Sequence, residues 1–465
     1  MTPREPSAAT ALEAETPDLF GHPKGLTFLF ATEMWERFSY FGMSALVVLY
    51  MVKYLFHPGQ VEAVLGYGTV KAALEALFGR LDPQPLASLI YGLYTGLAYF
   101  TPIAGGLLAD RVLGQRRTVI IGGVLMAIGH FMMTSEALFL PALLMLILGV
   151  GTFKPNISTQ VGRLYAPRDA RRLRAYSIFY VGINLGAFLA PLVCGTLGEE
   201  VGWHYGFGAA GVGMVIGLCI YLRGWPTLPP DAHASSRTRG SAPRSFGARE
   251  WRAVAALLAV YAPVALFWAA YDQQGNTIVL WAEDFTDRSI DLAWFKGTIP
   301  TTWFLALNPL LIFAFTPLLV RLWAWQRRLG VEPPTLGKMA LGYLGVAMAN
   351  LTMAAAAFGT GAGGKASWTW LAAYFVLITI GELHFAPVGL ALVSRLAPAR
   401  GLSLMMGIWF ATTFPGDLIG GFIGSFWSGM AKDRFFLIIA AIAGVAGVAT
   451  GALNRPLRAV LDERA

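Results

Sequence analysis

Six ionisable side chains stand inside long apolar runs of this 465-residue chain, where each charge costs at least ~2.5–3.5 kcal/mol. Four are acids and two are bases, so full ionisation would leave a net charge of −2 in a low-dielectric interior. Desolvation and like-charge repulsion then favour protonation of some carboxylates near neutral pH. The imbalance therefore predicts proton coupling. The six residues are Glu33, Glu36, Arg37, Lys154, Asp272 and Glu382.

The segment "EMWERFSYFG", which starts at Glu33, concentrates three of these groups on one helix face. Glu33 lies three residues before Glu36 and four before Arg37, which places the three side chains on the same side. Arg37 can therefore exchange a carboxylate partner for the carboxylate of a substrate, and a proton on either glutamate would release it. Tyr40 and Phe41 extend this face with aromatic surface. A static ion network that holds helices together is the alternative.

The composition is that of a membrane protein. Hydrophobic residues make up 56% of the chain and charged residues 13%, against about 25% charged in soluble proteins, and the mean hydropathy is +0.57. Twelve runs are long enough to cross ~30 Å of hydrocarbon. We place these spans at 27–55, 87–110, 117–135, 139–160, 175–198, 205–222, 251–282, 298–322, 336–358, 367–394, 402–429 and 435–454.

The loops between these runs set the orientation, because cytoplasmic loops are rich in Lys and Arg. With the N-terminus inside, only seven of the 35 Lys and Arg residues fall in outer loops, so we expect both termini in the cytoplasm. The net charge of +8 is then a topology signal and does not indicate nucleic-acid binding. Cys194 and Cys219 fall in apolar runs, so we expect no disulfide framework.

The run "GWPTLPPDAHASSRTRGSAPRSFGARE" separates six predicted spans from the other six, and its Pro, Ser and Arg content indicates a cytoplasmic linker. "RLYAPRDAR" after the fourth span is similar to "RLAPAR" after the tenth, which indicates an internal duplication with a site between the repeats. Chance similarity of two basic loops is the alternative. The predicted organisation is a cytoplasmic tail (1–25), a six-helix half (26–222), a linker (223–250), a second six-helix half (251–455) and a cytoplasmic tail (456–465).

The buried groups give the predicted site two poles. Lys154 lies nine residues before the first of the two similar loops, and Glu382 lies thirteen before the second. A cation in one half therefore opposes a carboxylate in the other. A zwitterion suits this polarity, with its carboxylate toward Arg37 and Lys154 and its ammonium toward Glu382. An extended chain spans at most ~3.3–3.6 Å per residue, so a peptide of two or three residues fits.

The loop "GGLLADRVLGQRR" between the second and third spans resembles the loop motif of the major facilitator superfamily. Its small residues permit close helix approach, and its charged residues can pair or cap helix ends. The resemblance implies a gate on the inner side, and a generic basic loop is the alternative. The residues concerned are Gly105, Gly106, Asp110, Arg111, Gly114, Arg116 and Arg117.

Further segments, in order along the chain, resemble the proton-coupled oligopeptide transporters, the POT or peptide-transporter family. They are "EMWERFSYFG", "GTFKPNIS", "FYVGINLGAF", "FWAAYDQQGNT", "LNPL", "GELHFAPVGL" and "MGIWF". The resemblance covers about residues 26 to 455. It implies an all-α membrane protein with twelve transmembrane helices, in the major facilitator fold of two six-helix halves.

The resemblance also implies roles for individual residues. Lys154 and Asp272 would form a pair between the halves, and Glu382 would hold the peptide amino terminus. The proton-coupling set is Glu33, Glu36, Arg37, Lys154 and Asp272. The substrate-binding set is Arg37, Tyr40, Phe41, Tyr99, Lys154, Asn184, Trp268, Asn308, Glu382, Trp409 and Phe410.

Three positions depart from the family pattern. The family commonly reads "YYGMRA" where this chain has "YFGMSA", so Phe41 lacks a hydroxyl and Ser44 replaces an arginine. The loss of that cation weakens the positive pole and puts affinity or selectivity in doubt. Asp272 is shorter than the glutamate frequent at its position, which puts its reach to Lys154 in doubt.

We therefore expect a proton-driven symporter of di- and tripeptides that works by alternating access and is not an enzyme. The alternatives are a proton-coupled transporter of nitrate, a modified peptide or a drug, and a receptor-like relative that no longer transports. The proton is the only coupling ion expected, with no metal or other cofactor. The expected partners are peptides, protons and the lipid bilayer, without nucleic acid, and the protein is expected to be a monomer in the bacterial cytoplasmic membrane.

Overall fold

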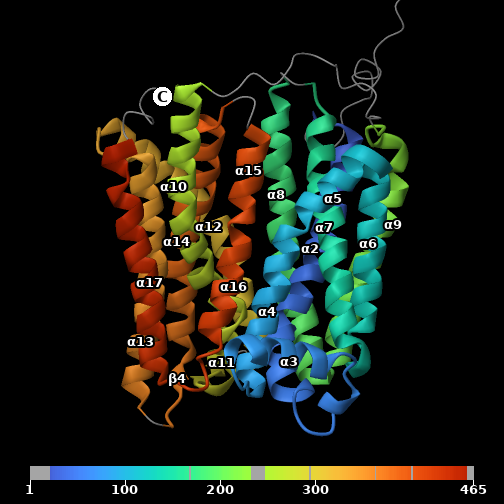
Figure 1. Cartoon of the computed structure of the whole chain (residues 1–465), viewed down its shortest axis with the longest axis vertical. Helices are drawn as coiled ribbons and strands as arrows, with labels where there is room; N and C mark the ends of the chain where they lie inside the picture. Colours follow the sequence, from blue (N-terminus) through green and yellow to red (C-terminus); the bar gives the residue numbers. More distant parts are fainter. Residues whose placement is uncertain are drawn as a thin grey trace, which may run out of the picture. The chain divides into compact units, whose positions relative to one another are not determined.

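Helices dominate the computed structural model (Figure 1). In hydrocarbon no water can satisfy the backbone, so each apolar segment closes its own hydrogen bonds as a helix. The predicted tail at 1–20, most of the predicted linker (232–246) and the predicted tail at 458–465 lie outside the described residues. The structure describes residues 21–166, 169–231, 247–292, 295–361, 363–398 and 402–457.

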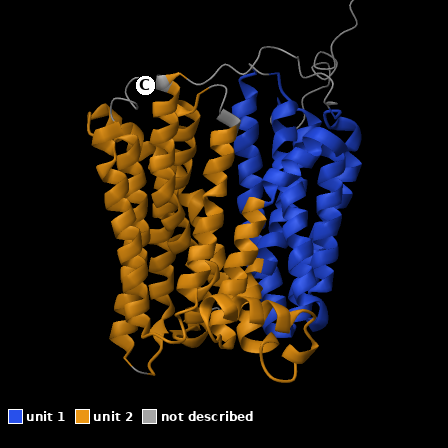
Figure 2. Cartoon of the chain, in the orientation of Figure 1, with its two compact units in different colours: residues 1–43, 101–238 blue, residues 44–100, 239–465 orange. Residues whose placement is uncertain are grey.

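The chain divides into two compact units, which Figure 2 colours separately. Unit 1 comprises residues 1–43 and 101–238, and unit 2 comprises residues 44–100 and 239–465. The first helix, α2 (Lys24–Tyr50), therefore begins in unit 1 and passes into unit 2 at Ser44. The predicted halves follow chain order instead, and they remain a prediction.

Each unit is built mainly from long helices. The other α-helices of unit 1 are α5 (Pro102–Leu108), α6 (Gln115–Met132), α7 (Phe139–Arg163), α8 (Arg171–Ala190) and α9 (Trp203–Gly224). Those of unit 2 are α3 (Tyr67–Phe78), α4 (Pro83–Phe100), α10 (Ala248–Tyr271), α11 (Thr277–Asp284), α12 (Leu307–Arg328), α13 (Thr335–Thr360), α14 (Trp368–Leu396), α15 (Leu402–Ala411), α16 (Thr413–Gly424) and α17 (Lys432–Ala452).

In the described part of the chain, ten helical segments are long and apolar enough to cross a membrane. Each of them overlaps one predicted span. The two remaining predicted spans are also helical, because α6 covers most of 117–135 and the consecutive helices α15 and α16 cover most of 402–429. A helical membrane protein is confirmed, while the count of twelve spans and the location of the termini remain predictions.

The all-α prediction needs one correction, because short strands occur in the loops between spans. Strand β1 (Thr286–Asp287) pairs in parallel with β4 (Ala366–Ser367). Strand β2 (Ser289–Leu292) forms an antiparallel hairpin with β3 (Phe295–Thr298). Backbone groups in these connections lie outside the helices, and pairing between strands satisfies part of their hydrogen bonding.

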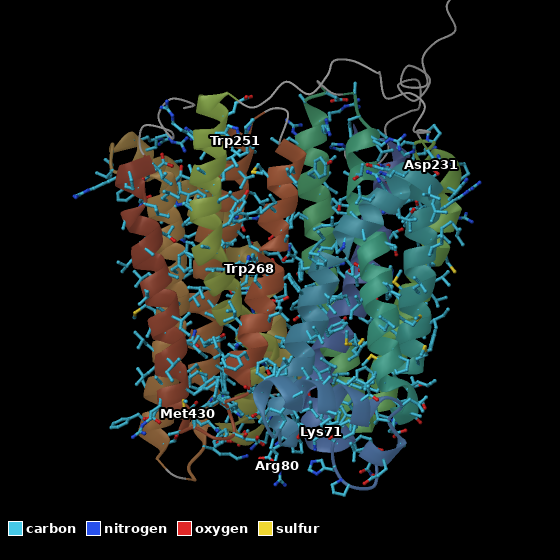
Figure 3. All side chains as sticks on the ribbon, in the orientation of Figure 1. Lys71, Arg80, Asp231, Trp251, Trp268 and Met430 are labelled. Carbon is cyan, nitrogen blue, oxygen red and sulfur yellow. The ribbon has the colours of Figure 1, made fainter. Side chains whose placement is uncertain are left out.

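Loops of unit 2 that the sequence predicts on one side of the membrane lie at one end of the unit. Figure 3 shows Lys71, Arg80 and Met430 at one end, and Trp251, in the first turn of α10, at the other. The predicted topology assigns the first three to the outer side and Trp251 to the inner side. The arrangement within unit 2 agrees with this alternation.

Glycines allow helix backbones to meet at closely packed crossings. In unit 1, a Cβ on Gly105 would lie 2.1 Å from the carbonyl oxygen of Gly151 on α7. Pro155 has no N–H to offer that carbonyl, which lies four residues before it. In unit 2, a Cβ on Gly92 of α4 would lie 2.8 Å from the Cα of Gly421 on α16. Both contacts exclude a side chain.

Several helices of unit 2 are interrupted. Residues Asp272–Gly275 form a 3-10 turn, η10, between α10 and α11. Only Thr412 separates α15 from α16, and the 3-10 segment η11 (Thr301–Ala306) leads into α12. Broken helices expose backbone and side-chain groups at membrane depth, where transport proteins place their ligands.

We predict that Gly105→Ala lowers the stability of the protein by about 1–3 kcal/mol, because the new methyl group overlaps a backbone carbonyl that cannot move aside. The matched control is Gly106→Ala, whose Cβ would approach nothing closer than Pro155 at 4.0 Å. Thermal unfolding of both variants in detergent measures the difference. Equal melting temperatures for Gly105→Ala and Gly106→Ala would contradict the packing argument.

Candidate functional site

Three of the predicted residues form a buried ion cluster on α2. The Arg37 Nη2 donates to Glu36 Oε1 at 2.6 Å, and its Nε contacts the other Glu36 oxygen. Glu33 Oε1 lies 3.4 Å from the same Nε. The three residues are at most 3% exposed. Arg37 is thus bound in bidentate fashion by one glutamate and approached by a second, which is the arrangement that an exchange of partners requires.

Lys154 joins this cluster from α7. It interacts electrostatically with Glu33, whose Oε2 has no hydrogen-bond partner among the described residues. Unit 1 therefore holds two acids and two bases together, and we name Glu33, Glu36, Arg37 and Lys154 the charge cluster. The predicted pairing of Lys154 with Asp272 joins residues of different compact units and remains a prediction.

Aromatic residues continue the face of α2 that carries the charge cluster. The guanidinium carbon of Arg37 lies 5.2 Å from the centre of the Tyr40 ring, a cation–π contact. Phe41 meets Tyr40 edge to face at 5.3 Å and packs against buried apolar residues that include Phe38 and Cys194. A phenyl ring suits that apolar surface, which accounts for the missing hydroxyl at Phe41.

Helix α8 packs directly on α2 beside the charge cluster. A Cβ on Gly186 would lie 2.2 Å from the carbonyl oxygen of Met34 and 3.0 Å from the Cβ of Arg37. The Asn184 side chain donates its N–H to the Tyr180 carbonyl of its own helix at 3.0 Å. Gly186 therefore brings α8 to the cluster, and the role of Asn184 with substrate remains a prediction.

In unit 2, a fixed carboxylate occupies the middle of α14. Glu382 Oε2 accepts hydrogen bonds from the Tyr271 hydroxyl at 2.7 Å and from Asn308 Nδ2 at 2.9 Å. Asn308 Nδ2 also lies 3.0 Å from the Thr379 hydroxyl oxygen. We name Glu382 with these two donors the acid pole. The sequence argument missed Tyr271, although it stands beside Asp272 in the quoted segment "FWAAYDQQGNT".

The sequence inventory of buried ionisable groups also omitted one residue. Asp417 on α16 is 2% exposed, which raises the acids in that inventory from four to five against two bases. Its carboxyl group is in hydrogen-bond contact with that of Asp272. The signal was present in the sequence as a lone acid in "TTFPGDLIGG", inside the eleventh predicted span.

The aromatic residues predicted to line the pocket differ in exposure. Trp268 lies well inside α10 and is partly exposed, and its indole N–H has no hydrogen-bond partner among the described residues (Figure 3). Trp409 is 2% exposed and packs into the space beside Gly389, whereas Phe410 is 52% exposed. Tyr99 is partly buried near the end of α4. Contact of these residues with substrate remains a prediction.

The predicted gating loop holds the start of the linker. The Arg116 backbone N–H donates to Asp231 Oδ1 at 3.0 Å, and the Arg116 side chain donates to the carbonyls of Leu228 and Pro229. Gly114 has φ +79° and lies against the Asp231 carboxyl, so a side chain there would be both strained and obstructed. The other charged residues of the motif are exposed, namely Asp110, Arg111 and Arg117.

Long apolar helices, buried ion clusters and interrupted helices that carry acids together define a membrane transporter. The family model described as "POT family" matches residues 116–236 and 246–438. The chain therefore belongs to the POT family, as the sequence resemblance predicted.

Two relatives and one solved structure illustrate the similarity. A di-/tripeptide transporter of Lactococcus lactis subsp. cremoris is 31% identical, over 96% of this chain and 97% of the relative. The peptide transporter YePEPT of Yersinia enterocolitica is 33% identical, over 87% and 88%. A crystal structure of a variant of a peptide transporter POT in complex with alafosfalin is 30% identical, with a TM-score of 0.80 over 96% of this chain and 97% of that one.

We predict that Arg37→Met destabilises the protein by about 3–5 kcal/mol, because two buried carboxylates lose their cation. Glu36→Leu should cost a similar amount, since it leaves the guanidinium with Glu33 alone on α2. The double variant should cost clearly less than the sum of the two, because it removes both charges of the pair. Thermal or denaturant unfolding in detergent measures the three variants, and additive losses would show that the two residues do not interact.

Proposed function

We propose that this protein is a proton-coupled symporter of di- and tripeptides that works by alternating access. The carrying observation is the acid pole, in which Glu382 is held by Tyr271 and Asn308. A carboxylate fixed in this way offers a binding site to an ammonium group and repels anions. The names of the relatives, a di-/tripeptide transporter and a peptide transporter, support a peptide as the cargo.

In this proposal the peptide binds by its two ends. Its carboxylate is bound by Arg37 and Lys154 of the charge cluster, and its ammonium is bound by Glu382. Arg37 is held by Glu36 and approached by Glu33 in the structure, so it becomes available when a proton neutralises one of the glutamates. Proton binding and peptide binding then promote each other, which is the requirement for symport.

The proposal includes the membrane arrangement predicted from the sequence. The protein spans the membrane twelve times with both termini in the cytoplasm, and it acts as a monomer in the bacterial cytoplasmic membrane. The alternation of loops between the two ends of unit 2 supports this topology. A nitrate-type transporter is disfavoured, since an anion would meet the fixed Glu382 carboxylate.

We predict that reconstituted protein accumulates labelled dialanine when the outside of the vesicle is made acidic, because protons drive the cargo inward. A protonophore should abolish accumulation while leaving exchange of labelled for unlabelled dialanine intact. Uptake is measured by filtration of the vesicles, with protein-free vesicles as the control. Accumulation that persists with the protonophore would refute proton coupling.

We predict that Glu382→Gln weakens binding of dialanine by about tenfold or more and weakens an amino-acetylated dialanine much less, because only the free ammonium pairs with the carboxylate. Competition against labelled dialanine measures both affinities. Glu62→Gln, at an exposed outer-loop carboxyl, serves as the matched control and should change neither. Equal weakening of both peptides by Glu382→Gln would refute the assignment of the ammonium to this residue.

A further inference from the structure

Asp272 and Asp417 meet where two helices of unit 2 are interrupted. Asp272 is the first residue of the 3-10 turn η10 that follows α10, and Asp417 lies in the second turn of α16. Their side chains are in hydrogen-bond contact, and Asp417 is 2% exposed. Unlike Glu36 in the charge cluster, Asp417 thus has a second carboxyl group as its contact.

Close backbone packing holds the two residues together. Gln273, next to Asp272, donates to the carbonyl of Gly420 at 2.9 Å, three residues beyond Asp417. On the other side of α16, a Cβ on Gly92 of α4 would lie 2.5 Å from the carbonyl oxygen of Asp417. Helix α16 is therefore fixed against both η10 and α4, so the contact between the carboxyl groups is set by the backbone and not by flexible side chains.

Two carboxyl groups in hydrogen-bond contact require a proton. Both ionised groups are acceptors only, so a hydrogen bond between them exists only when one carries an O–H that donates to the other. Like charges at this separation, away from water, disfavour the doubly ionised state strongly. The pair therefore titrates as one unit and retains its first proton over a range in which an isolated aspartate would be ionised.

The side chains around the pair are phenols and one further acid. Tyr91 on α4, Tyr271 at the end of α10, and Tyr374 and Glu382 on α14 interact electrostatically with Asp272, and Tyr91 also interacts with Asp417. Tyr94 and Tyr99 on α4 interact with Tyr91 in turn.

One of these phenols offers an unused donor. The ring of Tyr374 is fully buried, and its hydroxyl has no hydrogen-bond partner among the described residues. An unpaired O–H in the field of Asp272 can stabilise the charge that appears when the pair loses its proton. The surroundings thus suit a group that alternates between one proton and none.

We propose that Asp272 and Asp417 form a single proton-binding site in which the two carboxyl groups share one proton. The sequence motifs assign a proton-coupling role to Asp272 alone, and the structure adds Asp417 as an equal partner. The proton enters this site from the acidic side of the membrane and leaves it to the other side, with no other bond formed or broken. The inference rests on the proposed proton symport for its use in transport, but the shared proton can be tested without transport.

The direct test is infrared difference spectroscopy of the full chain in lipid nanodiscs without peptide, titrated with pH. The C=O stretch of a protonated carboxyl group should decrease as the pair loses its proton. Asp272→Asn and Asp417→Asn should each remove the same component, because either variant dissolves the pair. Asp291→Asn, at a carboxylate whose side chain is 71% exposed, is the matched control and should leave the component unchanged.

A titrating component that Asp417→Asn leaves at full intensity would overturn the proposal. Thermal unfolding of each variant shows that it is folded, and Asp417→Glu supplies a second variant that keeps a carboxyl group at this position. Asp417→Glu should retain the component at a shifted pH midpoint. Loss of the component in a folded Asp417→Glu protein would also count against a shared proton.

Transport supplies the second readout. Asp417→Asn should move the midpoint of the pH profile of dialanine uptake to more acidic values by on the order of one pH unit, because the proton loses its second carboxylate. Dialanine exchange at equal pH should change less than about twofold. An unchanged pH profile refutes the role of Asp417. If wild-type uptake itself ignores the proton gradient, the proposed symport fails, while the infrared result on the pair still stands or falls separately.

Discussion

The guanidinium of Arg37 lies against Glu36 and Glu33 in a part of α2 that solvent does not reach. Away from water, an unpaired charge costs several kcal/mol, so each buried ion needs a partner within the protein. Lys154 can act on Glu33 only because α7 packs tightly in unit 1, and Gly186 brings α8 onto α2 at the same level. The packing of unit 1 thus follows from the need to keep these charges together.

Unit 2 meets the same constraint with different residue types. Its buried acids are stabilised by neutral donors or by one another, since Glu382 accepts from a phenol and an amide while Asp272 contacts Asp417. Neutral donors leave the charge of Glu382 uncompensated, which suits an ammonium ligand. The breaks at η10 and between α15 and α16 place Asp272 and Asp417 at positions where the helices do not run continuously.

The departures from the family pattern gain a partial account. Phe41 packs on Tyr40 and on apolar residues that include Phe38, so the ring is part of the core of unit 1 and a hydroxyl is not needed there. Ser44 Oγ is buried without a hydrogen-bond partner among the described residues, and nothing in the structure explains the loss of the arginine at this position.

The sequence by itself determined the local part of the site and the family. The three- and four-residue spacing of Glu33, Glu36 and Arg37 fixes their common face, because backbone hydrogen bonds set the pitch of a helix. Hydropathy determined the helical membrane class, and motif order determined the family. Only the tertiary structure revealed the partners of Glu382 and the contact of Asp272 with Asp417. Those contacts join helices far apart in the chain, and they depend on where glycines such as Gly92 let two backbones meet, which helical periodicity cannot specify.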